Sequence, residues 1–127
     1  MAKLVPILGT IVLIGAIFQV VLGFQVAADV QGLRDIHMGI GIFGLVLVVT
    51  LAVLAFRAKT GIVYSEITMT VLTIIVVLQV LLGFQLSQGA DVMLVSHEAT
   101  AFVIVLLALL TGGMTYWSST RLTRTHT

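Results

Sequence analysis

The sequence predicts an all-α integral membrane protein: a single domain over residues 1–127, formed by an antiparallel bundle of four transmembrane helices. Its composition, the placement of its few charges and an internal repeat predict this fold. Hydrophobic residues make up 60% of the chain and charged residues only 9%, whereas a soluble domain carries roughly a quarter charged residues. The mean hydropathy is +1.25. Because a transmembrane helix needs about 20 apolar residues, the chain has room for four spans and little else.

The charged residues divide the chain into four apolar segments. Each segment is close to the length that crosses the hydrocarbon core, and each is expected to be a helix because an open sheet leaves backbone groups unpaired in lipid. The first segment is too long for the apolar part of a cleavable signal peptide, so we interpret it as the first span. In order, the predicted spans cover about residues 4–26, 36–56, 67–86 and 99–117.

Most basic residues lie on one side of the predicted bundle. Five of the six precede the first span, connect the second to the third, or follow the fourth, and only Arg34 lies on the opposite side. Since Lys and Arg accumulate in cytoplasmic segments, we expect both termini to face the cytoplasm in a multi-pass protein of the cell membrane. The five residues are Lys3, Arg57, Lys59, Arg121 and Arg124.

An internal repeat relates the two halves of the chain. The segment 19–25 reads QVVLGFQ and the segment 79–85 reads QVLLGFQ, an offset of 60, and the same offset relates His37 to His97. Each repeat contains two spans, so both copies enter the membrane from the same side. The chain is therefore a duplicated helical hairpin with parallel repeats, related by a pseudo-two-fold axis along the membrane normal. The two repeats cover about residues 4–57 and 64–117.

His37 and His97 are the candidate metal ligands. They begin the second and fourth spans, which places both at the same depth near the outer face. The second and fourth helices of an up-down bundle are diagonal partners, and the two-fold relation is expected to direct the two imidazoles at each other across the core. Two neutral imidazoles that face each other are the ligand set of a haem iron bound from both sides. Ionisable residues inside a membrane are functional candidates by default because their insertion is unfavourable.

The remaining polar residues favour haem over a zinc or di-iron site. The chain has no cysteine, which excludes thiolate-bound haem, iron–sulfur clusters and attached c-type haem. A structural zinc ion needs four ligands, and only Asp35, Asp91 or Glu98 could complete the histidine pair. Glu98 directly follows His97 and so points about 100° away from it on a helix. Haem needs only two axial ligands and a large apolar slot.

Small and aromatic residues near the level of the histidines are the candidate lining of that slot. A flat macrocycle approaches the helix backbone closely where residues are small, and Phe24 and Phe84 are placed to flank the ring. Arg34 is the one base on the outer side and is a candidate partner for a haem propionate. Gln19 and Gln79 lie deeper and are interpreted as interhelical hydrogen-bonding residues. The small candidates are Gly23, Gly39, Gly41, Gly83, Ala99 and Ala101.

One stretch of the second repeat resembles the haem A synthase family. The run LQVLLG at residues 78–83 is followed by a short polar loop and then by His97, Ala99 and Ala101, as in a four-helix half of that family. Its members usually have eight spans in two such halves, with compact four-helix archaeal members among them. The resemblance covers nearly the whole chain but one half of the usual protein. It implies that His37 and His97 are the axial ligands of one haem b, or of haem O as a substrate.

The sequence departs from that family at the positions linked to catalysis. The catalytic half of a family member carries a glutamate three residues before the histidine of its second helix and usually an arginine after that histidine; these positions are Arg34 and Met38 here. Asp35 is acidic but lies one residue out of register, and the loop cysteine pair of many members is absent. The sequence therefore favours haem binding over the conversion of haem O to haem A.

Three functions stay open on the sequence alone. The first is a b-type membrane cytochrome that passes electrons between a quinol in the bilayer and a redox protein at the outer face. The second is a compact haem A synthase that oxidises the methyl group of haem O to give haem A. The third is a haem-free membrane subunit or transporter, although the first span lacks the acidic residue that small multidrug exporters need. The expected surroundings are the lipid bilayer, with a homodimer as an open alternative, and no nucleic acid partner is expected.

Overall fold

Four long helices form the protein, and the predicted four-helix fold is confirmed. The computed structural model describes residues 4–28, 30, 32–57 and 63–124, so Lys3, Lys59 and His126 lie outside the described residues. No strand occurs in the described part of the chain. The elements in order are α1 (Leu4–Ala27), α2 (Leu33–Arg57), α3 (Val63–Ser87), the 3-10 turn η1 (Asp91–Met93) and α4 (Leu94–Arg124).

Each of the four helices is long and apolar enough to cross a membrane. The apolar stretches cover 21 to 25 residues, which matches the roughly 20 residues that the hydrocarbon core requires. The chain is rich in valine and isoleucine, which favour strands on a half-buried sheet. A helix nevertheless forms because it pairs every backbone group within one segment, which lipid demands. The described chain is a multi-pass, all-helical membrane protein.

Three helices begin earlier than the predicted spans. α3 begins at Val63, before the predicted start near residue 67. α2 begins at Leu33 and has Asp35 in its first turn, although the predicted span starts only at residue 36. α4 begins at Leu94, also before its predicted span. Hydropathy marks only the part of a helix that lies in hydrocarbon, whereas the backbone hydrogen bonds continue into the polar headgroup region. Arg34 is therefore a helical residue of α2 and is held at a defined place on it.

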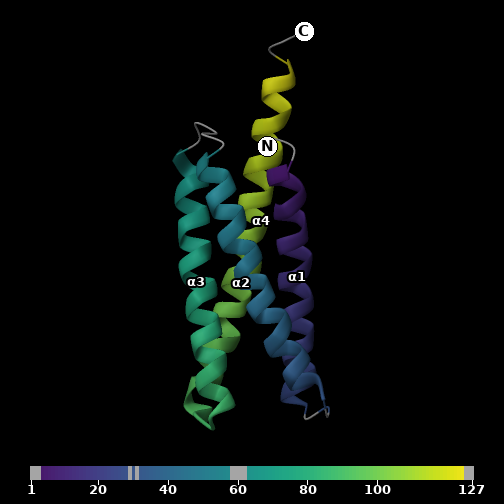
Figure 1. The fold of residues 1–127 in the computed structure, drawn as a ribbon, viewed down its shortest axis with the longest axis vertical. Helices are drawn as coiled ribbons and strands as arrows, with labels where there is room; N and C mark the ends of the chain where they lie inside the picture. Colours follow the sequence, from purple (N-terminus) through teal and green to yellow (C-terminus); the bar gives the residue numbers. More distant parts are fainter. Residues whose placement is uncertain (1–3, 29, 31, 58–62, 125–127) are drawn as a thin grey trace.

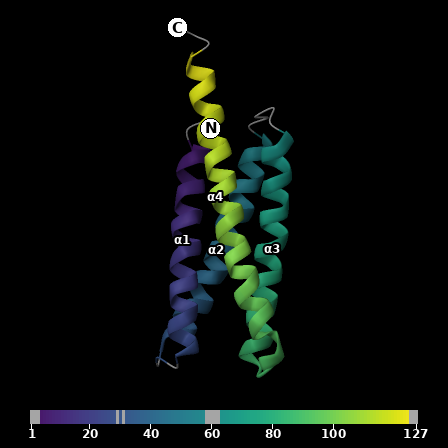
Figure 2. The same ribbon diagram turned by 180° about the vertical axis from the view of Figure 1, so that it is seen from behind.

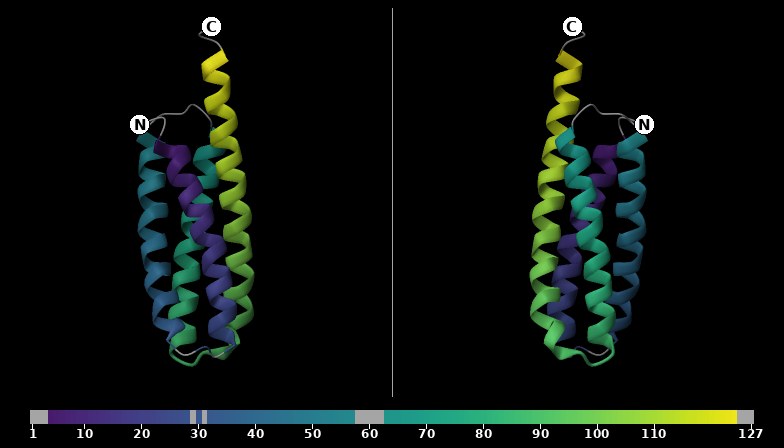
Figure 3. Two further views of the ribbon diagram at one scale, coloured as in Figure 1. Left: turned by 90° about the vertical axis from the view of Figure 1, so that its right-hand side faces the viewer. Right: turned by 90° about the vertical axis from the view of Figure 1, so that its left-hand side faces the viewer.

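The helices form a four-membered ring in which α2 and α4 lie diagonally opposite. α1 packs against α2 and α4, and α3 packs against the same two helices. α1 begins and α4 ends at the same end of the bundle, which is here called the terminal end (Figure 1). The connections at Gly32 and Gly89 lie at the opposite end, here called the hairpin end (Figure 3). Figure 2 shows α4 extending past the other helices at the terminal end.

Both connections at the hairpin end turn at a glycine. The φ angles of Gly32 and Gly89 are +80° and +88°, a region that glycine adopts without the steric cost of a Cβ atom. At the end of α3 the backbone N–H of Gly89 donates to Leu86 O at 3.0 Å, and that of Ala90 donates to Gln85 O at 3.2 Å. These bonds satisfy carbonyls that the end of the helix leaves unpaired and make the turn short.

The interior is packed near the terminal end and hollow near the hairpin end. Leu51, Met69 and Leu72 are the largest fully buried side chains, and they lie in the half of α2 and α3 nearer the terminal end. Toward the hairpin end the α1–α2 pair and the α3–α4 pair diverge (Figure 1). The buried cluster consists of Val12, Val48, Leu51, Ala52, Ala55, Met69, Leu72, Val76 and Ala108.

Candidate functional site

A large apolar cavity lies between the diverging hairpins. Its volume is about 810 Å³ and all four helices contribute to its wall, which falls within the roughly 300–1,000 Å³ of small-molecule and cofactor sites. Most lining residues are aliphatic, glycine or phenylalanine. The polar side chains on the wall come from Gln19, Gln79, His37 and His97, with Arg34, Ser87 and Glu98 nearer the hairpin end.

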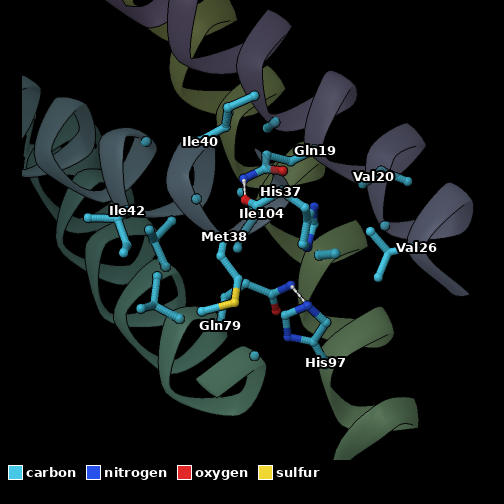
Figure 4. A pocket seen from close by; sticks show the side chains of 18 of the residues that line it. Gln19, Val20, Val26, His37, Met38, Ile40, Ile42, Gln79, His97 and Ile104 are labelled. Atoms are coloured by element: carbon cyan, nitrogen blue, oxygen red, sulfur yellow. Dashed lines mark hydrogen bonds between the residues drawn. The ribbon is translucent and has the colours of Figure 1, made fainter. Parts of the chain in front are cut away.

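His37 of α2 and His97 of α4 meet in this cavity (Figure 4). Their ring centroids are 6.2 Å apart and their ring planes make an angle of 76°. The expectation that the repeat brings the two imidazoles together across the bundle is confirmed by this distance. The Nδ1 atom of each ring is buried and has no hydrogen-bond partner. Buried polar atoms are nearly always paired in proteins, so two such nitrogens in one apolar cavity call for an explanation.

Two glycines of the repeat leave space for the imidazoles. A Cβ atom at Gly83 would lie 3.0 Å from Cε1 of His97, and a Cβ atom at Gly23 would lie 3.6 Å from Cε1 of His37. The first distance is shorter than nearly all real Cβ contacts, and the second is an ordinary van der Waals contact. Each histidine therefore packs on the preceding helix of its own hairpin, and the contact of His97 at Gly83 is the tighter of the two.

Two glutamines of the repeat connect the helices of each hairpin at the same level. Gln19 Nε2 donates to the backbone carbonyl of His37 at 2.9 Å. Gln79 Nε2 lies 3.2 Å from the ring Nε2 of His97, and the hydroxyl of Thr100 donates to Gln79 Oε1. The interhelical role predicted for both glutamines is confirmed. Their contact with the histidines was not predicted, and it makes them part of the site.

Arg34 crosses from one hairpin to the other at the rim of the cavity. Its Nη2 atom donates to the backbone carbonyl of Ser87, at the end of α3, at 2.6 Å. A guanidinium carries five N–H donors, and this contact uses one of them. Arg34 is exposed and also lines the cavity, so its positive charge lies where an anionic group of a bound molecule would meet solvent.

The nine residues predicted to bind a cofactor all line this one cavity. Gly39 and Ala99, the other small residues near the histidines, are exposed and do not line it. They follow the histidines by two positions, roughly 200° around a helix, whereas residues four positions on share the face of the histidine. The nine residues are Gly23, Phe24, Arg34, His37, Gly41, Gly83, Phe84, His97 and Ala101.

Three residues of the site were missed by the sequence analysis. Met38 lines the cavity beside His37, and the ring of Phe102 lies 6.3 Å from that of Phe24, which brings α1 and α4 together along one side. Thr100 orients Gln79. The residue equivalent to Thr100 in the first half is Ile40, and the neighbouring positions of the two repeats differ as well, so the repeat did not single out Thr100.

The separation of the two imidazoles matches that of a pair that binds one metal ion between them. Among the described residues no group of three or more His, Cys, Asp or Glu side chains lies together, and the cavity offers two imidazoles from opposite helices. Two imidazoles that bind one ion in line have centroids about 6 Å apart, because a metal–nitrogen bond is about 2 Å and a ring nitrogen lies about 1 Å from the ring centre. The observed separation of 6.2 Å meets this requirement.

Fold and site together define a four-helix membrane protein with paired histidines in an apolar cavity between two repeated hairpins. Comparison with protein-family models, curated proteins and solved structures gives no match for the chain.

Proposed function

We propose that the protein is a b-type membrane cytochrome that binds one haem between His37 and His97 and serves in electron transfer. The pair of imidazoles across an apolar cavity is the observation that carries this proposal, with ring centroids 6.2 Å apart. A further feature supports it: the glycine beside each ring. The resemblance to one half of a haem A synthase, which holds haem between histidines on its second and fourth helices, points to the same group.

Each part of the site has a distinct task in this proposal. The two imidazoles hold the iron, Gly23 and Gly83 keep the rings close to the helix backbones, and the apolar wall excludes water. Arg34 at the rim would pair with a carboxylate of the haem edge, a charge-assisted contact. When bound between these two imidazoles, haem would supply one-electron chemistry, which suits electron transfer. A quinol in the bilayer or a redox protein at the outer face is the corresponding partner.

The contact of Arg34 favours an electron carrier over an enzyme that oxidises haem. The catalytic half of a haem A synthase has a glutamate at the position equivalent to Arg34. Here the guanidinium donates to the carbonyl of Ser87, and an arginine stays protonated and cannot take the part of a carboxylate. The acidic neighbour Asp35 is exposed and does not line the cavity.

Protein purified from haem-replete cells is expected to be red, with a six-coordinate low-spin absorption spectrum. The expected stoichiometry is one haem per chain, since one pair of histidines holds one iron. The pyridine haemochrome spectrum measures both the amount and the type of haem, and haem b is the expected type. Colourless protein that does not bind added haem would overturn the proposal.

A comparison with haem O separates the electron carrier from the synthase. Haem O supplied to the purified protein with oxygen and a reductant is expected to be recovered unchanged when the porphyrin is extracted and analysed by mass. A hydroxylated or formyl product would instead assign the protein to haem A synthesis.

The proposal also places the haem toward the outer face, with both termini in the cytoplasm. This orientation is supported by Arg57 in the last turn of α2 at the terminal end and by Asp35 and Asp91 at the hairpin end, since basic residues accumulate on the cytoplasmic side. The native chain has no cysteine, so single cysteines give clean labelling. A membrane-impermeant maleimide is expected to label Gln88→Cys in intact cells and Thr127→Cys only after permeabilisation; the reverse pattern would invert the orientation.

A further inference from the structure

The histidines of the two repeats make different contacts with the glutamines beside them. Gln19 and Gln79 occupy equivalent positions, but their amides contact different groups (Figure 4). Gln19 Nε2 donates to the backbone carbonyl of His37, which leaves the ring of His37 out of this contact. Gln79 Nε2 lies against the ring nitrogen Nε2 of His97 at 3.2 Å.

One substitution between the repeats accounts for this difference. Three residues after His97 the hydroxyl of Thr100 lies within hydrogen-bond distance of Gln79 Oε1 on α3 and of the backbone carbonyls of Ser96 and His97 on its own helix. Donation of its single proton to Gln79 Oε1 places the oxygen end of the amide toward Thr100 and its NH2 end toward His97. Three residues after His37 the chain has Ile40, which offers no hydroxyl. Gln19 Oε1 is accordingly buried without a partner, and the NH2 end of Gln19 turns to the carbonyl of His37.

The orientation of Gln79 determines which nitrogen of His97 carries the proton. An amide NH2 group only donates, so Nε2 of His97 must accept with its lone pair. A neutral imidazole then has its proton on Nδ1. The lone pair on Nε2 is the one that a metal ion would use, so Gln79 and iron compete for the same atom of His97.

We infer that His37 is the permanent ligand of the proposed haem and His97 an exchangeable one, so that the reduced protein accepts a small neutral diatomic ligand, such as carbon monoxide, in place of His97. This inference rests on the proposed haem site. In the exchange the bond from iron to His97 Nε2 breaks, the diatomic ligand takes the vacated position, and the hydrogen bond from Gln79 to His97 Nε2 re-forms. No electron and no proton is transferred. Gln79 and Thr100 are positioning residues that stabilise the released His97.

The first test needs no haem and measures the proton position on His97 directly. Nitrogen NMR of the haem-free protein, with labelled histidine, is expected to show His97 with its proton on Nδ1. Thr100→Val keeps the shape of the side chain and removes the hydroxyl, and it is expected to shift His97 toward a mixture of tautomers, whereas Thr100→Ser restores the wild-type signal. A proton on Nε2 in the wild type, or no change in Thr100→Val, overturns the inference.

The second test measures affinity for carbon monoxide in the reduced, haem-loaded protein. Wild type is expected to bind carbon monoxide, with a matching change in its absorption spectrum. Gln79→Leu is expected to weaken this affinity about threefold to tenfold, because the released His97 loses one hydrogen bond. Thr100→Val should weaken it in the same direction. The matched control is Gln85→Leu, on an exposed position of α3 outside the cavity.

The outcomes separate this inference from the proposed function. A wild-type protein that binds no haem overturns the proposed function itself. A haem-loaded, low-spin wild type that refuses carbon monoxide overturns only the exchange of His97. Carbon monoxide affinity that is the same in Gln79→Leu and in wild type also overturns the inference, and leaves the haem site in place.

Discussion

Replacing His37 or His97 with alanine is expected to abolish the six-coordinate low-spin spectrum of the haem-loaded protein. The two imidazoles come from diagonally opposite helices and approach to a centroid separation of 6.2 Å. Each would supply one axial bond to the iron, and removal of either leaves one axial position without its imidazole. Absorption and electron paramagnetic resonance spectra of the purified variants measure the change in coordination and spin state.

Two controls make the histidine experiment decisive. His126→Ala removes the remaining histidine, in the C-terminal tail of the sequence, and is expected to leave the spectrum unchanged. Free imidazole added to His97→Ala is expected to restore a six-coordinate spectrum, because the substitution empties a space of the same shape. Retention of the low-spin spectrum in either alanine variant would show that the two histidines are not a pair of ligands.

Gly83→Ala is expected to weaken haem binding about tenfold or more. The new Cβ atom would lie 3.0 Å from Cε1 of His97, and an imidazole packed between helices has to turn or shift to relieve that contact. Overpacking of this kind costs about 1–3 kcal/mol in protein interiors, and each 1.4 kcal/mol is about tenfold in affinity. Titration of the haem-free protein with haem in detergent measures the dissociation constant.

The equivalent glycine of the other repeat provides the matched comparison. A Cβ atom at Gly23 would lie 3.6 Å from Cε1 of His37, an ordinary contact, so the loss of affinity in Gly23→Ala is expected to be much smaller. Both substitutions place the same methyl group at the same position of the repeat. Equal losses in the two variants would mean that helix packing in general, rather than the position of His97, limits haem binding.

Much of the fold could be predicted because lipid permits few structures. Four apolar segments of the right length, in a solvent that provides no hydrogen bonds, can only become helices or part of a closed barrel. The ends of the helices were predicted less well. α2 and α4 extend through polar residues such as Arg34 and Asp35, because helical hydrogen bonding continues where hydropathy has already fallen.

The repeat was enough to predict which histidines meet in the site, but it did not predict the hydrogen bonds between the site residues. The offset that relates His37 to His97 was enough to predict that they meet, since a two-fold relation between hairpins brings equivalent residues to the same level. The contact of Gln79 with His97 Nε2 depends on which way one amide group turns. That choice is made by Thr100, one of several positions after the histidines at which the two repeats differ.

The sequence by itself determined that this chain crosses a membrane four times and carries two histidines in symmetric places, because composition, length and an internal repeat are properties of the chain alone. Only the tertiary structure decided where the bundle is packed and where it is hollow. It also decided which glycine packs closely against an imidazole and which ring nitrogen is hydrogen-bonded. These features depend on how far the two hairpins diverge and on which neighbour each side chain reaches. Both the divergence of the hairpins and the neighbours of each side chain depend on residues from all four helices.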